Sequence, residues 1–260
     1  MTGSFEGKVA LVTGATSGIG RATAIAFGRQ GASVVVAGRR EAEGFETVAQ
    51  IEALGAAAKF VQTDVSRSAD VENMVRTAVL TYGKLDCAIN NASVGWPSGL
   101  KRLHEYSEAE WYEVSDINEK GVWLCMRSEL KQMLHQEPDG DAGLRGVITN
   151  VGSVASLRAG PTAPYTASKH AVLGLTRSAA LEYGRDAIRV NALCPGVVQT
   201  DMVNPGVTVP TEMAEMFVAA NRLGRWGKPD EIADAILYSC SDESTFMTGH
   251  ALVIDGGLSA

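Results

Sequence analysis

Short runs of β-branched and aliphatic residues alternate with longer amphipathic segments along this chain. Apolar residues in the longer segments recur at helical spacing, whereas the short apolar runs are typical of buried strands. The predicted strands are 8–13, 33–37, 59–62, 85–90, 146–151, 188–193 and 251–255. The predicted helices are 18–30, 41–54, 69–82, 108–136, 163–183, 211–221 and 231–240.

The order of these elements predicts the fold. Strands bounded by helices on both sides form a parallel sheet that is covered on both faces, and right-handed crossovers then give a doubly wound α/β fold. Glycines 31, 55 and 83 directly follow predicted helices, where a left-handed residue commonly ends a helix. Because no repeat, low-complexity tract or flexible linker is evident, we expect residues 1–260 to form a single domain.

Composition narrows the class of protein and its partners. The chain has 260 residues and a net charge of −7, so it lacks the basic field that nucleic acid or an anionic membrane requires. No apolar run reaches the roughly 20 residues of a bilayer span, and the first residues lack the apolar core of a signal peptide. The histidines show no ligand spacing, so we expect no metal site. A cytoplasmic setting with buried thiols is expected from the four separated cysteines, Cys87, Cys125, Cys194 and Cys240.

The segment Tyr165-Thr-Ala-Ser-Lys169 carries the first candidate chemistry. On the predicted helix 163–183, Tyr165 and Lys169 lie one turn apart on the same face. An ammonium group there would favour the phenolate and lower the tyrosine pKa from about 10, which would give a general acid or base. The alternative is a tyrosine and a lysine on a solvated helix surface, where both are common.

The segment Thr13-Gly-Ala-Thr-Ser-Gly-Ile-Gly20 lies between the first predicted strand and helix. Its glycines permit positive φ and leave backbone N–H groups open to a ligand, and the N-terminus of the helix favours a pyrophosphate. Thr16 and Ser17 add hydroxyl donors. The spacing G-x-x-x-G-x-G differs from both the G-x-G-x-x-G fingerprint and the Walker loop. A turn that only packs the strand on the helix is the alternative.

Five motifs in one order resemble those of the short-chain dehydrogenases/reductases. They are Thr13-Gly-x-x-x-Gly-Ile-Gly20, Asn90-Asn-Ala92, Ser153, Tyr165-x-x-x-Lys169 and Pro195-Gly196. The resemblance extends from about residue 7 to residue 257 and implies a Rossmann-type sheet of seven parallel strands. It also implies an NAD(P)-dependent oxidoreductase that interconverts a carbonyl and a secondary alcohol by hydride transfer. The family is usually tetrameric, so we expect a homotetramer.

The resemblance implies the catalytic roles. Tyr165 would donate the proton in carbonyl reduction and accept it in alcohol oxidation. Lys169 would lower the tyrosine pKa and hold the nicotinamide ribose. Ser153 would hydrogen-bond the substrate oxygen, where negative charge develops. Ser156 and Ser168 are rival hydroxyls for this last role.

The remaining site residues follow from the same resemblance. Asn118 would support a water relay to the lysine, with a solvent-facing asparagine as the alternative. Asn91 would line the cofactor site, and Ser93 replaces the glycine that is commoner there. The backbone of Val198 and the hydroxyl of Thr200 would hold the carboxamide. The expected cofactor contacts are Gly14, Thr16, Ser17, Gly18, Ile19, Arg39, Asp64, Val65, Asn91, Tyr165, Lys169, Pro195, Val198 and Thr200.

The end of the second predicted strand bears on the choice of nicotinamide. NAD binders usually place an acidic residue there, whereas a 2′-phosphate favours arginine. Gly38 occupies the acidic position and Arg39 follows it, so we expect NADP(H), with NAD(H) possible because Arg39 could instead stack on adenine or reach solvent. Ser17 argues the other way, since some NADP-preferring relatives are basic there. Asp64 would accept from the adenine amine, or would cap the next turn.

Three segments are expected to line the substrate pocket: 93–103, 154–161 and 196–221. We expect a mostly apolar ketone or alcohol substrate and a substrate-binding loop at about 196–224, in which 211–221 forms a lid helix. The apolar side chains that these segments offer are Val94, Trp96, Leu157, Met202, Val203, Met213, Met216 and Phe217.

Two other function classes fit the same fold. An epimerase or dehydratase would use the nicotinamide transiently, but relatives of that kind generally carry a further C-terminal substrate region, and this chain ends directly after its last predicted strand. A nucleotide-sensing protein would not need the proton donor that Tyr165 and its neighbours imply.

Overall fold

The computed structural model describes residues 4–140, 142–204 and 211–260, without the side chain of Met213. Seven strands form one parallel sheet within these residues, as the sequence predicts, and their order is β3-β2-β1-β4-β5-β6-β7. The strands are β1 (Val9–Thr13), β2 (Ser33–Gly38), β3 (Ala58–Gln62), β4 (Cys87–Asn90), β5 (Gly146–Val151), β6 (Ile188–Pro195) and β7 (Ala251–Ile254).

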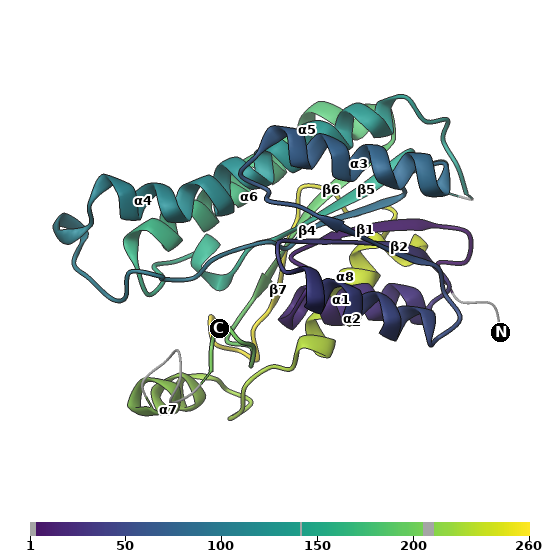
Figure 1. Ribbon diagram of the computed structural model, residues 1–260. Helices are drawn as coiled ribbons and strands as arrows, with labels where there is room; N and C mark the ends of the chain where they lie inside the picture. Colours follow the sequence, from purple (N-terminus) through teal and green to yellow (C-terminus); the bar gives the residue numbers. More distant parts are fainter. Residues whose placement is uncertain (1–3, 141, 205–210) are drawn as a thin grey trace.

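Helices cover both faces of this sheet (Figure 1). One face carries α1 (Gly18–Arg29), α2 (Glu41–Glu52) and α8 (Pro229–Cys240). The other carries α3 (Ser68–Tyr82), α5 (Gly121–Leu134) and α6 (Ala163–Tyr183), with α4 (Glu108–Ser115) lying against α6. Helix α7 (Thr211–Ala220) lies apart from both layers. No helix in these described ranges is long and apolar enough to cross a membrane.

Alternate residues of the central strands supply two cores. Leu11 and Ile148 pack in the core beneath α3, α5 and α6. Val12 and Ile89 pack in the opposite core, together with Phe27 of α1. Strands of a parallel sheet are buried on both faces, and the uninterrupted apolar runs in the sequence follow from this.

The single helix predicted over 108–136 is wrong in one respect. Helix α4 ends at Ser115, and a π-helical turn, η2 (Asp116–Lys120), connects it to α5. At the end of this turn a Cβ on Gly121 would lie only 2.9 Å from Cγ2 of Val65, so the backbone passes close to the loop after β3. Turns of this kind are frequent at functional sites, and Asn118 lies at its centre.

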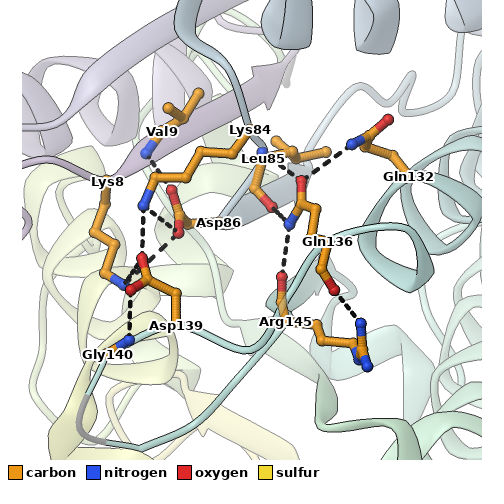
Figure 2. A network of polar contacts seen from close by, with 10 residues as sticks. All are labelled: Lys8, Val9, Lys84, Leu85, Asp86, Gln132, Gln136, Asp139, Gly140 and Arg145. Carbon is orange, nitrogen blue, oxygen red and sulfur yellow. Dashed lines mark hydrogen bonds and ion pairs between the residues drawn. The ribbon is translucent and has the colours of Figure 1, made fainter.

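A polar network holds the loop between α5 and β5 at the N-terminal edge of the sheet (Figure 2). Lys84 donates to Asp139 over 2.8 Å and lies 3.1 Å from Asp86. Lys8 pairs with the same two carboxylates at 3.5 and 3.6 Å. The hydrogen bonds from Lys84 and from the Gly140 N–H hold the pKa of Asp139 well below its usual range. These contacts tie the loop to the strand ends that lie opposite the ligand-binding edge of such sheets.

Candidate active site

A cavity of about 420 Å³ opens at the carboxyl ends of the strands. It spans β1 and β4, where the strand order reverses and where ligands bind in doubly wound folds. The cavity contains every site residue predicted from the sequence except Asn118. These lining residues are Gly14, Thr16, Ser17, Gly18, Ile19, Arg39, Asp64, Val65, Asn91, Ser153, Tyr165, Lys169, Pro195, Val198 and Thr200.

The glycine-rich loop is shaped by its contact with Asn91. Gly14 has a φ of +65°, and Asn91 Nδ2 donates to the Thr13 carbonyl oxygen over 3.0 Å. A Cβ on Gly20 would lie 2.4 Å from both Asn91 Nδ2 and the Gly14 carbonyl oxygen. Ser17, at the N-terminus of α1, makes no side-chain capping bond. The glycine at 20 is therefore required by close packing within the protein, and the first N–H groups of α1 face the cavity without a serine cap.

Thr16 and two arginines form the end of the cavity next to β2. Thr16 Oγ1 accepts from Arg40 Nε and Nη2 over 3.3 and 3.2 Å. A Cβ on Gly38 would lie 2.7 Å from Thr16 Cγ2, so an acidic side chain at 38 does not fit beside Thr16. Arg39 also lines the cavity. Sequence reasoning missed Arg40, although the Arg-Arg pair was a visible signal.

Asp64 serves the local turn as well as the cavity wall. Its Oδ1 accepts from the Ser66 N–H over 3.0 Å and from Ser66 Oγ over 2.7 Å. Burial opposes ionisation of Asp64, but the bonds from Ser66 and the charges of Arg39 and Arg67 outweigh it, and the pKa is lowered. The turn-capping alternative raised from the sequence is therefore present in the structure.

Tyr165 and Lys169 lie together in the cavity wall on α6. Lys169 Nζ is 5.6 Å from the centroid of the Tyr165 ring and donates to the Val151 carbonyl oxygen over 2.9 Å. Burial lowers the pKa of Lys169 to about 8. Burial also raises the pKa of Tyr165, and hydrogen bonding to Ser153 opposes that rise only in part. The lowered Tyr165 pKa expected from the helix spacing is therefore wrong for this structure, because desolvation of the phenolate outweighs the hydrogen bond with Ser153.

Among Ser153, Ser156 and Ser168, the serine that lines the cavity is Ser153. Its Oγ accepts from the Ala155 N–H over 3.1 Å at the start of a short turn. Ser156 instead accepts the Ser153 N–H, and Ser168 donates to the Tyr165 carbonyl oxygen over 2.8 Å. Neither of these rivals lines the cavity. The positions thus favour Ser153 among the three serines.

Asn118 lies behind the cavity wall and is fully buried. Its Oδ1 accepts from the Val94 N–H over 2.8 Å and from Ser93 Oγ over 3.1 Å. Its Nδ2 donates to the Val94 carbonyl oxygen over 2.8 Å and to Ser168 Oγ over 3.3 Å. The solvent-facing alternative is therefore wrong. The side chain fixes the loop after β4, which forms part of the cavity wall.

Comparison with known proteins agrees with this geometry. The family model described as enoyl-(acyl carrier protein) reductase matches residues 14–259. The A-factor type gamma-butyrolactone 1′-reductase of Streptomyces virginiae is 40% identical over 98% of this chain and 96% of its own. The 3beta-hydroxysteroid dehydrogenase of Mediterraneibacter gnavus is 38% identical over the same shares. The crystal structure of levodione reductase superimposes with a TM-score of 0.88 at 33% identity, covering 97% of this chain and 98% of that one.

The chain belongs to the short-chain dehydrogenase/reductase family. It is therefore an NAD(P)-dependent oxidoreductase that acts on CH–OH groups and interconverts carbonyls and alcohols. The cavity fits a dinucleotide of this kind. The cavity is lined by a glycine-rich loop at a helix N-terminus, and it extends from Thr16 to Tyr165.

The substrate side of this dehydrogenase/reductase cavity agrees only in part with the expected walls. Trp96 packs edge-on against Tyr165 with ring centroids 6.1 Å apart. Leu157, Met216 and Phe217 do not line the cavity, and Met216 is 68% exposed on α7. Residues 205–210 and the Met213 side chain of the expected loop lie outside the described residues. Of the expected apolar side chains, Val94, Met202 and Val203 line the cavity.

Proposed function

We propose that this enzyme uses NADP(H) to interconvert a mostly apolar ketone and its secondary alcohol, with Tyr165 as the general acid and base. The observation that carries the proposal is the meeting of Tyr165, Ser153 and Lys169 in the cavity whose other end is the glycine-rich loop. An NAD(H)-preferring dehydrogenase of the same type is the alternative.

When bound in this cavity, NADPH would supply the hydride that reduces the substrate carbonyl carbon. The Ser153 hydroxyl donates a hydrogen bond to the substrate oxygen as its negative charge develops. Tyr165 transfers its phenolic proton to that oxygen, which completes the alcohol. Lys169, protonated below a pKa of about 8, stabilises the phenolate that remains. Asn118 holds the Val94 loop beside this reaction centre and, we propose, supports the water relay that returns a proton. Oxidation runs these steps in reverse.

Replacing Tyr165 tests the catalytic assignment. A positioned general acid raises the rate of the chemical step by about 10²- to 10⁴-fold, so Tyr165→Phe should lower kcat by that factor. The variant should still bind NADPH, which nicotinamide fluorescence measures. Tyr112→Phe, at an exposed tyrosine of α4, is the matched control. A folded, NADPH-binding Tyr165→Phe enzyme with wild-type kcat would refute the catalytic role of Tyr165.

A panel of ketones, assayed by NADPH absorbance, separates the three function classes. An oxidoreductase consumes NADPH, an epimerase changes the substrate without net cofactor turnover, and a sensor only binds the nucleotide.

The cofactor preference has its own test. The space at Gly38 is taken by Thr16, which supports a site without an acidic group, and Arg39 and Arg40 offer charge-assisted bonds to a 2′-phosphate. Such a bond is worth about 1.5–3 kcal/mol, so Arg39→Ala should lower kcat/KM for NADPH by about tenfold or more and leave NADH unaffected. Arg40→Ala shows whether the arginine bound to Thr16 shares this role. If the Arg39 variant keeps the wild-type ratio of kcat/KM for NADPH to kcat/KM for NADH, Arg39 does not determine the cofactor preference. A wild-type enzyme that prefers NADH would overturn the NADP(H) assignment.

The substrate class and assembly are part of the same proposal. Val94, Met202 and Val203 support an apolar substrate, as do relatives named as a butyrolactone reductase and a hydroxysteroid dehydrogenase. Preference for a densely charged substrate in a panel assay would contradict it. We further propose that about 196–224 acts as the substrate-binding loop within a single domain, in a cytoplasmic homotetramer. Partly exposed Trp111 and Trp123 on α4 and α5 support the assembly, and light scattering measures it.

A further inference from the structure

Four polar side chains form a buried cluster between the sheet and the helices behind the active site: Glu129 of α5, Asn90 of β4, Asn150 of β5 and Thr176 of α6, which we name the Glu129 cluster. Asn90 Nδ2 donates to Glu129 Oε2 and to Asn150 Oδ1, both over 2.9 Å. Asn150 Nδ2 donates to Thr176 Oγ1 over 2.9 Å. The cluster therefore connects α5 to β4, β5 and α6, the three elements that carry or directly precede residues of the catalytic cavity.

Two buried oxygen atoms of this cluster have no hydrogen-bond partner. They are Glu129 Oε1 and Asn90 Oδ1, and they belong to the two groups that already face each other through Nδ2 and Oε2. An ionised carboxylate and an amide oxygen are both acceptors, so neither can satisfy the other. A proton on Glu129 Oε1 would turn it into a donor and leave Asn90 Oδ1 as its available acceptor. Buried polar atoms are seldom left unsatisfied, which favours this protonated form.

The surroundings of Glu129 contain no compensating charge within the described ranges. No ion pair there includes Glu129. The titratable neighbour on its own helix is the Cys125 thiol, whose pKa burial and Glu129 both raise. On α6, the Lys169 ammonium is engaged by the Val151 carbonyl oxygen. The other residues that α3 and α6 bury are uncharged, among them Val71, Met74, Val75, Ala78, Val172, Thr176 and Ala179. Burial accordingly raises the pKa of Glu129 to about 7.

We propose that Glu129 is a positioning residue, held as a neutral carboxylic acid that donates to Asn90 and so aligns the strands that carry the active site. Asn90 directly precedes Asn91, which holds the glycine-rich loop. Asn150 stands three residues before Ser153 at the end of β5. Thr176 stands seven residues after Lys169 on α6. Loss of the proton places a carboxylate against the Asn90 oxygen and disturbs these contacts together. The inference rests on the proposed function, because the residues it aligns are those assigned there.

The test compares wild type with Glu129→Gln, which keeps an N–H donor at this position and cannot ionise. The ratio of wild-type kcat to variant kcat cancels the titration of Tyr165 and Lys169. We expect this ratio to fall by at least about threefold between pH 6 and pH 9, since the wild-type residue ionises in that interval and the glutamine does not. Glu182→Gln, at an exposed glutamate on α6, should follow the wild-type profile. A constant ratio would overturn the proposal.

A second measurement keeps the inference separate from the proposed function. The infrared spectrum of the wild type at pH 6 should contain a protonated-carboxyl band that Glu129→Gln lacks. Absence of that band would show an ionised Glu129 and overturn the proposal, whatever the enzyme turns over. If neither the wild type nor any variant reduces a ketone, the proposed function fails. The infrared band and the pH dependence of the free energy of unfolding would still show whether Glu129 is protonated.

Discussion

Replacing Gly20 by alanine should disrupt both the stability of the fold and the cofactor site. The new Cβ would lie 2.4 Å from Asn91 Nδ2 and 2.4 Å from the Gly14 carbonyl oxygen, far inside van der Waals contact. The Asn91 side chain must move to relieve the first contact, and the Gly14 peptide, which is part of a tight turn at a φ of +65°, must shift to relieve the second. Movement of Asn91 breaks its bonds to the carbonyl oxygens of Thr13 and Gly14, at 3.0 and 3.4 Å.

The expected loss follows from these contacts. Overpacking costs about 1–3 kcal/mol, and each lost hydrogen bond costs about 1 kcal/mol. Alanine recovers about 1 kcal/mol of helix propensity in the first turn of α1. The net loss is about 2–4 kcal/mol in the free energy of unfolding. For a chain of this size that corresponds to a fall in Tm of roughly 5–15 °C.

Thermal unfolding and NADPH titration measure the two effects together. Gly227→Ala is the control, because its Cβ would meet Val198 Cγ2 at 3.4 Å, an ordinary contact. In a double-mutant cycle with Asn91→Ala, the double variant should lose about 2 kcal/mol less than the sum of the single variants, since both single variants remove the same two hydrogen bonds. A Gly20→Ala protein with wild-type Tm and wild-type NADPH affinity would refute the reasoning, as would strict additivity in the cycle.

Three further predictions concern buried ionisable side chains. Arg189, 4% exposed, donates to the carbonyl oxygens of Ser239, Met247 and Ser241, so Arg189→Met should lower the free energy of unfolding by about 3 kcal/mol in urea titrations; a loss below about 0.5 kcal/mol would contradict this. The folded pKa of Lys169, about 8, lies below the ordinary 10.5, so the ammonium group loses its proton as the pH rises past about 8. The value of kcat/KM for ketone reduction should therefore decline above that pH. A flat profile from pH 7 to 10 would argue against an active-site role for the Lys169 charge. The folded pKa of Glu129, about 7, lies above its ordinary 4.5, so the stabilising contribution of its neutral form is complete below pH 4.5 and is lost as the pH rises to about 7. Over that interval the free energy of unfolding of the wild type should fall by about 3 kcal/mol relative to that of Glu129→Gln. Parallel stability curves for the two proteins would exclude this pKa.

Local sequence signals located most elements to within a residue or two. Helix α6 and strand β5 have the predicted bounds, Ala163–Tyr183 and Gly146–Val151. Helix ends are marked by residues whose effect is local, such as Gly83, which has a positive φ and directly follows α3. The π-helical turn at Asn118 could not be predicted in the same way. Its Asn and Gly are unfavourable in any helix, but its geometry depends on Val94 and Val65, which belong to other parts of the chain.

The sequence by itself determined the layers of this protein, the order of its motifs and the residue types available at the carboxyl ends of the strands, because periodicity and glycine placement act over a few residues. Tertiary structure alone decided the raised pKa of Tyr165, the pairing of Arg40 with Thr16 and the unpaired oxygen atoms of Glu129 and Asn90. Each of these depends on how much water is excluded and on which distant group faces the side chain. Neither quantity exists until the sheet and its helices have closed around the site.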